Sequence, residues 1–310
     1  MSKNTIRPDV QVLLDLLSTT PLARLGELSV EETRAISKQM RPPLLEQSLV
    51  SVRDISFTHP GGEIGLRCYN TEDRGVPTPL ILYFHGGGFV LGDLDSHHEL
   101  CLTIAHDLDL PLVSVDYRLA PENPWPAAPD DAETAARWIA TNASNVLGLR
   151  LTGLVLAGDS AGGNLAAVTA RALTDKPVDT PLIGQFLIYP CVSVVEETRS
   201  RQENAEGYYL TRKVLDWFTA QYDAPADDPR FNLFAFDQTG MPPTLLVTAG
   251  LDPLRDEGRA YAARLIEAGV PVVYQEAVGN IHGCFSMAAA IPSTKRDVDR
   301  ALAALDVLIS

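Results

Sequence analysis

Continuous apolar runs alternate with helical patterns along most of this chain of 310 residues, and this alternation constrains the fold most strongly. Six apolar runs have the length and composition of buried strands, namely residues 80–84, 112–116, 154–157, 182–189, 244–248 and 270–275. Helical patterns separate and follow them, at residues 96–107, 127–141, 161–174, 211–222, 254–268 and 294–309. Such alternation indicates a parallel sheet that helices cover on both faces.

Two more strands precede this series. Residues 49–57 and 64–69 lie on either side of a Pro60-Gly61-Gly62 turn and are expected to form a hairpin. The sequence therefore predicts an α/β protein with an eight-stranded, mostly parallel sheet.

Two segments fall outside the alternating pattern. Residues 1–45 look helical, with Pro8 placed to open one helix and a Ser29–Glu32 capping box placed to open another that ends near Gln39. Residues 191–240 contain no convincing core strand, and an excursion of that length inside an α/β domain is usually functional, often a lid. We expect these two segments to lie apart from a core made of residues 46–190 and 241–310.

Charge and cysteine usage narrow the partners and the compartment. The 25 Lys and Arg against 40 Asp and Glu give a formal net charge of −15, which repels nucleic acid and anionic membrane surfaces. Four scattered cysteines without a CxxC pair are typical of free thiols in a reducing compartment. No apolar run reaches the roughly 18 residues of a membrane helix, so a cytoplasmic protein is expected.

The pentapeptide Gly158-Asp159-Ser160-Ala161-Gly162 stands between a strand pattern and a helix pattern. Gly-x-Ser-x-Gly at such a junction forms a turn so tight that side chains two before and two after the serine would clash. The serine is then exposed at the carboxyl end of its strand, above a helix N-terminus that favours negative charge. Ser160 is thus a candidate nucleophile, with a merely structural glycine-rich turn as the alternative.

A serine hydroxyl needs a base, and the base needs an orienting acid. In folds with this turn the order along the chain is serine, acid, histidine. His282 is the only histidine after Ser160, so it is the candidate base. Asp252 follows the strand at 244–248 and is the candidate acid, whereas Asp256 and Glu257 suit the first turn of the next helix.

The run His85-Gly86-Gly87-Gly88 directly follows the strand at 80–84. Glycines let backbone N–H groups approach a substrate oxygen, and lipases and esterases use this kind of motif as an oxyanion hole. The expected donors are the N–H groups of Gly87, Gly88 and Ala161, while His85 is expected to brace the loop by a hydrogen bond.

Five motifs, in order and correctly spaced over about residues 80–285, resemble those of the hormone-sensitive-lipase-like esterases of the α/β-hydrolase superfamily. They are His85–Gly88, the Asp-Tyr-Arg-Leu-Ala-Pro-Glu run at 116–122, Gly158–Gly162, the Asp-Pro-Leu-Arg-Asp-Glu-Gly run at 252–258, and Ile281-His282-Gly283. The resemblance implies an α/β-hydrolase fold with a helical cap built from residues 1–45 and 191–240. It also implies short- to medium-chain carboxylic ester substrates, no metal or cofactor, and in many members a homodimer formed through the sheet edge and the C-terminal helix.

Some details depart from that pattern or stay open. Family members usually have phenylalanine two residues after the catalytic histidine, where this chain has Cys284, which we interpret as a small apolar filler. A crowded set at Asp93, Asp95, His97 and His98 suggests a metal site, yet its spacing matches no tight ligand pattern and suits a helix start. Four aromatic residues of the cap are expected to wall the acyl pocket, with plain packing as the alternative: Tyr208, Tyr209, Trp217 and Phe218.

The sequence therefore predicts a serine carboxylesterase that acts on small-molecule esters through Ser160, His282 and Asp252. An amidase or deacetylase with the same residues is the first alternative, and nothing in the sequence decides between them. A ligand-binding protein on a hydrolase scaffold is a weaker one, because the relatives of that kind lack the histidine that this chain retains.

Overall fold

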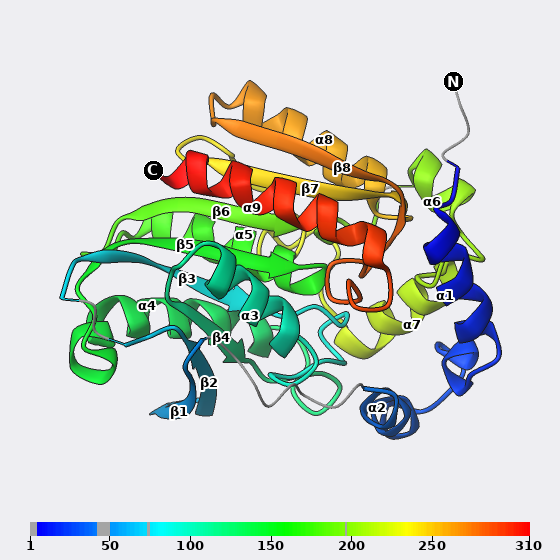
Figure 1. Cartoon of the computed structure of the whole chain (residues 1–310), viewed down its shortest axis with the longest axis horizontal. Helices are drawn as coiled ribbons and strands as arrows, with labels where there is room; N and C mark the ends of the chain where they lie inside the picture. The colour runs from blue at the N-terminus through cyan, green and yellow to red at the C-terminus, as the bar shows by residue number, and fades with distance from the viewer. Residues whose placement is uncertain (1–4, 42–49, 73–74, 196) are drawn as a thin grey trace.

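One eight-stranded sheet organises the computed structural model, which describes residues 5–41, 50–72, 75–195 and 197–310 (Figure 1). The strand order is β1-β2-β4-β3-β5-β6-β7-β8. The β1–β2 and β2–β4 pairs are antiparallel and the other five are parallel, which confirms the predicted mostly parallel sheet. The strands are β1 Val52–His59, β2 Gly62–Tyr69, β3 Thr78–Phe84, β4 Leu112–Asp116, β5 Leu151–Asp159, β6 Leu182–Ile188, β7 Thr244–Leu251 and β8 Val272–Ile281.

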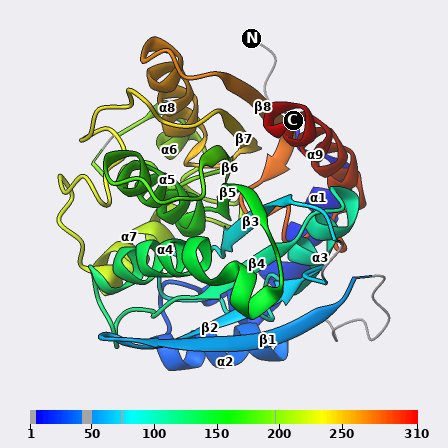
Figure 2. The same cartoon turned by 90° about the vertical axis from the view of Figure 1, so that its left-hand side faces the viewer.

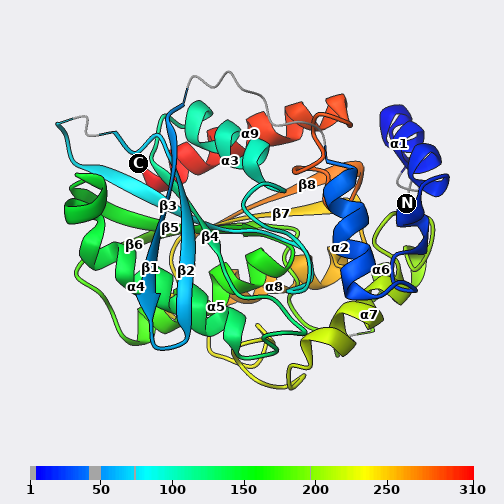
Figure 3. The same ribbon diagram turned by 90° about the horizontal axis from the view of Figure 1, so that it is seen from below.

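Helices cover both faces of this sheet, as the continuous apolar strands require. Helices α3 and α9 lie on one face and α4, α5 and α8 on the other, which Figures 2 and 3 show from two directions. Each face has its own buried apolar cluster. The helices are α3 His98–Asp107, α4 Ala127–Leu147, α5 Ala161–Asp175, α8 Arg255–Glu267 and α9 Lys295–Ile309.

The remaining helices gather at one end of the molecule (Figure 1). They are α1 Pro8–Ser18, the 3-10 turn η1 Pro21–Arg24, α2 Val30–Gln39, α6 Arg199–Glu203 and α7 Arg212–Tyr222. A second 3-10 turn, η2 Pro292–Thr294, directly precedes α9. The capping box of α2 is present, with Ser29 and Glu32 each accepting the other's backbone N–H. Between 191 and 240 the described residues form no strand.

Strands β5, β7 and β8 extend further toward their carboxyl ends than the apolar pattern predicts, and each extension positions a polar residue. Strand β5 runs to Asp159, directly before Ser160. Strand β8 continues through Gly279, whose φ of +73° accompanies a register shift against β7, until Ile281 pairs with Leu251. Because Asp252 and His282 each follow one partner of that pair, the sheet itself places them side by side.

No helix among the described residues combines the length and the hydropathy that crossing a membrane requires. Strand β8 is an edge of the sheet, and the homodimer expected from the family resemblance stays a prediction.

The contact between β3 and the turn after β5 tests how strictly the fold depends on glycine. A Cβ on Gly162 would lie 1.9 Å from the carbonyl oxygen of Phe84, so backbone would have to move. We expect Gly162→Ala to lower the free energy of unfolding by about 3 kcal/mol, or to prevent folding. The change in the free energy of unfolding is measured by urea unfolding.

Gly65→Ala is the matched control, because its added Cβ would meet its nearest neighbour, Asp116, at an ordinary 3.4 Å. Equal urea midpoints for the two variants would contradict the steric argument.

Candidate active site

Ser160 occupies a strained turn between β5 and α5. Its φ is +56°, a conformation that few residues other than glycine adopt, and strain of this kind concentrates at functional sites. The turn is held by the N–H of Ser160, which donates to Ile188 O at 2.9 Å, and by the N–H of Cys191, which donates to Ser160 O at 3.0 Å. A Cβ on Gly158 would lie 2.3 Å from Gly162 O, so the chain crosses itself here with no room for side chains.

Ser160, His282 and Asp252 form one continuous line of hydrogen bonds. His282 Nε2 lies 2.8 Å from Ser160 Oγ, and His282 Nδ1 lies 2.7 Å from Asp252 Oδ2. The other carboxylate oxygen of Asp252 accepts the N–H of Leu254 at 2.8 Å, so the buried carboxylate is fixed at both oxygens. Since a carboxylate only accepts, Nδ1 carries the hydrogen and Nε2 faces the serine as an acceptor. This geometry can remove a proton from the hydroxyl.

The two neighbouring acids serve other contacts in the first turn of α8, where the sequence predicts them. Asp256 accepts the N–H of Ser200 at 2.9 Å. Glu257 is buried, accepts the N–H of Val192 at 2.9 Å and pairs with Arg201 at 2.7 Å. Sequence reasoning did not foresee that both acids tie the start of the 191–240 segment to the core, because their partners are distant in sequence.

The glycine loop after β3 approaches Ser160 with backbone groups alone. Gly87 and Gly88 have φ values of +122° and +61°, and a Cβ on Gly87 would lie 2.2 Å from Leu91 O. Within the described residues, no hydrogen bond uses the N–H of Gly87, Gly88 or Ala161. Unpaired donors around a nucleophile suit an oxyanion, and the assignment of these three residues to that role stays a prediction.

His85 braces this loop, as its sequence position indicates. Its Nδ1 donates to Gly86 O at 2.8 Å, and its own carbonyl accepts the hydroxyl of Tyr117 at 2.7 Å. The two rings stack with centroids 4.3 Å apart. His85 Nε2 is buried without a partner in the described part of the chain. Burial, together with the nearby charge of His97, lowers the pKa of His85 to about 4.

A largely apolar cavity of about 520 Å³ opens over Ser160 and His282. Tyr209 and Phe218 line it, but Tyr208 and Trp217 do not. Tyr208 packs against the cluster beneath α3 and α9, and Trp217 makes an edge contact with Phe218 at 5.2 Å between centroids. Other apolar side chains that line the cavity are Leu13 and Leu17 of α1, Leu22 of η1, Leu25 just after η1, and Val214 and Leu215 of α7.

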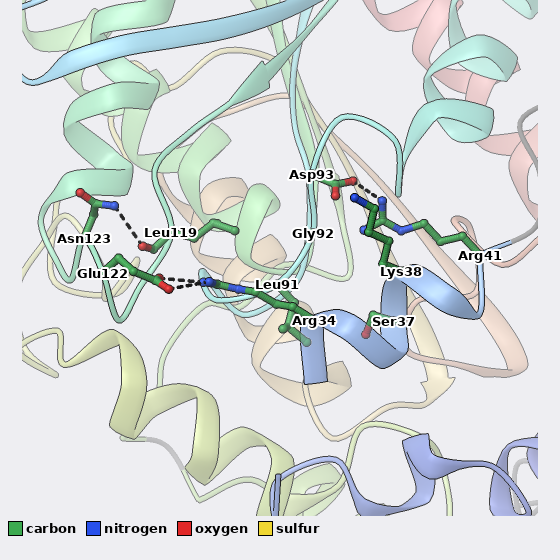
Figure 4. Close-up of a pocket in the computed structure, with 10 residues that line it drawn as sticks. All are labelled: Arg34, Ser37, Lys38, Arg41, Leu91, Gly92, Asp93, Leu119, Glu122 and Asn123. Carbon is green, nitrogen blue, oxygen red and sulfur yellow. Dashed lines mark hydrogen bonds and ion pairs between the residues drawn. The ribbon is translucent and has the colours of Figure 1, made fainter. Parts of the chain in front are cut away.

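Helix α2 forms one wall of this cavity. It also borders a second cavity of about 400 Å³, whose lining includes several charged side chains and shares Ser37 and Arg41 with the first (Figure 4). Arg34 pairs with Glu122 at 2.7 Å and donates to Val90 O and Ala120 O at 3.0 and 2.8 Å. Arg41 pairs with Asp93 at 2.8 Å. Helix α2 is thereby attached to the loop that follows the glycines, which no local sequence signal reveals.

The crowded polar set near α3 separates in space. Asp93 Oδ1 accepts the N–H of Ser96 in a turn that precedes α3, while His98 lies 3.1 Å from the hydroxyl of Tyr69. The expected helix cap is absent, because the N-cap residue of α3 is His97, which makes no side-chain cap hydrogen bond. The described residues contain no group of three or more His, Cys, Asp and Glu side chains that could hold a metal ion. Cys284 is fully buried in an apolar cluster, and burial raises the pKa of its thiol well above the usual value, which confirms it as an apolar filler.

Comparison with known proteins shows which family this chain resembles. A family model described as the alpha/beta hydrolase fold matches residues 81–286. The carboxylic ester hydrolase LipN of Mycobacterium tuberculosis is 38% identical over 301 residues, covering 92% of this chain and 78% of its own. An ethyl acetate hydrolase of Pseudomonas putida is 38% identical over 77% of each chain. The solved ester hydrolase EH1AB1 from the Lake Arreo metagenome, complexed with a bipyridine phosphonate derivative, superposes with a TM-score of 0.88 at 38% identity, covering 98% of this chain and 99% of its own.

The buried His85 makes acid sensitivity a test of the loop geometry. Its folded pKa of about 4 lies below the usual 6.5, so the unfolded chain takes up a proton first as the pH falls. Stability from His85 is therefore present above pH 6.5 and lost between about 6.5 and 4, by about 2 kcal/mol from pH 7.5 to pH 5. From pH 7.5 to pH 5, we expect the free energy of unfolding of His85→Gln, measured by urea unfolding, to fall by about 2 kcal/mol less than that of wild type. An equal loss in both proteins would contradict the buried neutral ring.

Proposed function

The chain belongs to the α/β-hydrolase family, in its hormone-sensitive-lipase-like branch, and is a carboxylic ester hydrolase; we propose that it cleaves short- to medium-chain esters through an acyl-enzyme on Ser160. The observation that supports this mechanism best is the unbroken hydrogen-bond line from Asp252 through His282 to Ser160. The substrates are small-molecule esters.

In the proposed reaction, Ser160 Oγ attacks the ester carbonyl carbon while its proton passes to His282 Nε2. The carbonyl oxygen becomes an oxyanion that accepts the N–H groups of Gly87, Gly88 and Ala161. When the ester C–O bond breaks, the proton on His282 goes to the departing alcohol. A water molecule then gives a proton to His282 Nε2 and attacks the acyl carbon. The bond from the acyl carbon to Ser160 Oγ breaks, His282 returns the proton to Oγ, and the acid is released. Asp252 stabilises the imidazolium in both halves.

The cavity supports the chain-length assignment. Phe218 from α7 lies directly over the glycine loop, because a Cβ on Gly88 would come within 2.3 Å of its ring. The Phe218 ring fills space beside the proposed oxyanion site, while leucines of α1 and η1 line another part of the cavity. We infer that the helices at this end act as a cap that selects acyl chains of limited length.

The location of the enzyme stays a prediction. All four cysteines, Cys68, Cys101, Cys191 and Cys284, are free, as expected for a chain in the reducing cytoplasm.

The first test is hydrolysis of p-nitrophenyl esters from acetate to palmitate by wild type and Ser160→Ala. We expect the highest kcat/KM among short and medium chains, and a loss of at least about a thousandfold in the variant, because Ser160 is the one hydroxyl that hydrogen-bonds to His282 Nε2 among the described residues. An amide matched to the best ester measures the amidase alternative. Equal turnover by both folded proteins would overturn the proposed mechanism.

The second test concerns the cap. Phe218→Ala removes the ring over Gly88, so we expect kcat/KM for the longest accepted ester to rise about tenfold and the chain-length optimum to move upward. Trp217→Ala is the matched control, because it removes an aromatic ring from the next position of α7 without removing cavity lining. The same shift in both variants would show general loosening of the cap instead of a specific wall.

A further inference from the structure

A second histidine–aspartate pair lies beneath the glycine loop, and the mechanism above does not use it. Asp159 directly precedes Ser160 and is 3% exposed, and His97 is 8% exposed. His97 belongs to the polar set before α3 that the sequence singled out, yet it turns away from Asp93 and His98 toward the end of β5. Burying the Asp159 carboxylate is costly unless it is paired, and His97 supplies a partner. The reaction proposed above does not explain why this pair lies here.

Asp159 collects three donors. Its Oδ1 accepts the N–H of Gly86 at 2.8 Å and the hydroxyl of Tyr83 at 2.7 Å. His97 Nε2 lies 3.2 Å from Oδ1 and 3.3 Å from Oδ2. Because carboxylate oxygens only accept, His97 Nε2 carries the hydrogen in this contact.

His97 is itself held in place from the other side. Its Nδ1 lies 2.9 Å from Ser96 Oγ, and Ser96 Oγ accepts the N–H of Asp93 at 2.9 Å. The imidazole thus joins the loop before α3 to the carboxylate beside the nucleophile. Burial raises the pKa of Asp159, but the charge and hydrogen bond of His97, with the Tyr83 hydroxyl, hold it below its usual value.

The contact with Gly86 is close enough to fix the loop. A Cβ on Gly86 would lie 2.5 Å from Asp159 Oδ2 and 3.0 Å from the Asp159 carbonyl oxygen, so the loop rests on this residue. Gly87 and Gly88 follow at once, and because glycine has no side chain their backbone is freer than that of other residues, so an anchor beside them restricts it. One carboxylate therefore touches both the nucleophile's own turn and the first residue of the oxyanion loop.

We propose that Asp159 and His97 are positioning residues that lock the Gly86 peptide so that the donors after it face the oxyanion formed at Ser160. The inference rests on the proposed function. Neither side chain touches the reacting atoms. Asp159 sets where the loop lies, and His97 keeps the carboxylate in place and offsets its charge, which would otherwise oppose the negative charge of the oxyanion.

The test compares Asp159→Asn and His97→Gln with wild type on the best p-nitrophenyl ester. A misplaced oxyanion loop weakens transition-state binding and leaves substrate binding intact, so we expect kcat to fall about ten- to hundredfold with KM within about twofold. A trifluoromethyl ketone, whose tetrahedral serine adduct carries an oxyanion, should bind weaker by the same factor as kcat falls, whereas the matched secondary alcohol should bind equally. The double variant should lose no more than the worse single variant, because both changes break one unit.

His98→Gln is the matched control, because this neighbouring buried histidine contacts Tyr69 and not the glycine loop. It should retain wild-type kcat. Unchanged kcat and ketone affinity in both test variants would overturn the inference, as would a rise in KM that accounts for the whole loss. If Asp159→Asn does not fold, the inference is tested with His97→Gln alone, which keeps the carboxylate, on the same kcat, KM and ketone affinity.

The Ser160→Ala variant separates this inference from the proposed function, because its activity tests the nucleophile and does not depend on Asp159 or His97.

Discussion

The close approach of the β5–α5 turn to the end of β3 is the constraint on which the rest of the structure depends. Gly158 and Gly162 have no side chains, so the serine turn can lie against the carbonyl of Phe84, the residue before the glycine loop. The proposed nucleophile and the proposed oxyanion donors therefore come from two neighbouring parallel strands and need no intervening element. Any side chain at these positions would separate the two halves of the site by the width of a methyl group or more.

The third part of the site follows from the pairing of β7 with β8. A register shift lets Leu251 and Ile281 pair, and Asp252 and His282 come next on each strand. The helices at the end of the molecule are attached differently, through ion pairs such as Arg34–Glu122 and Arg201–Glu257. Their apolar side chains are left to line the cavity. The rigid sheet thus sets the chemistry, while a separately anchored group of helices shapes the space above it.

The sequence was sufficient where local chemistry dictates geometry. Glycines around Ser160, apolar strand runs and the order serine, acid, histidine each follow from rules that act within a few residues, and all three predicted residues meet in space. The sequence was insufficient where the direction of a side chain decides which residues line the cavity. Tyr208 and Trp217 sit beside Tyr209 and Phe218 in sequence, but only the latter two face the cavity, because a one-residue step turns a side chain to another face. The contact of His97 with Asp159 spans 62 residues and leaves no local pattern.

Two histidine–aspartate pairs therefore flank Ser160, and their surroundings separate their tasks. His282 Nδ1 contacts Asp252, and His282 Nε2 contacts the serine hydroxyl where both residues line the cavity. In the proposed reaction a proton arrives and leaves at Nε2. In the His97 pair, Nε2 faces the carboxylate and Nδ1 faces Ser96, so both nitrogens are engaged by groups other than the Ser160 hydroxyl. In the proposed roles, the same two residue types move a proton in one place and only hold a loop in the other. The difference lies in which atom the second nitrogen meets, and that is set by the fold around it.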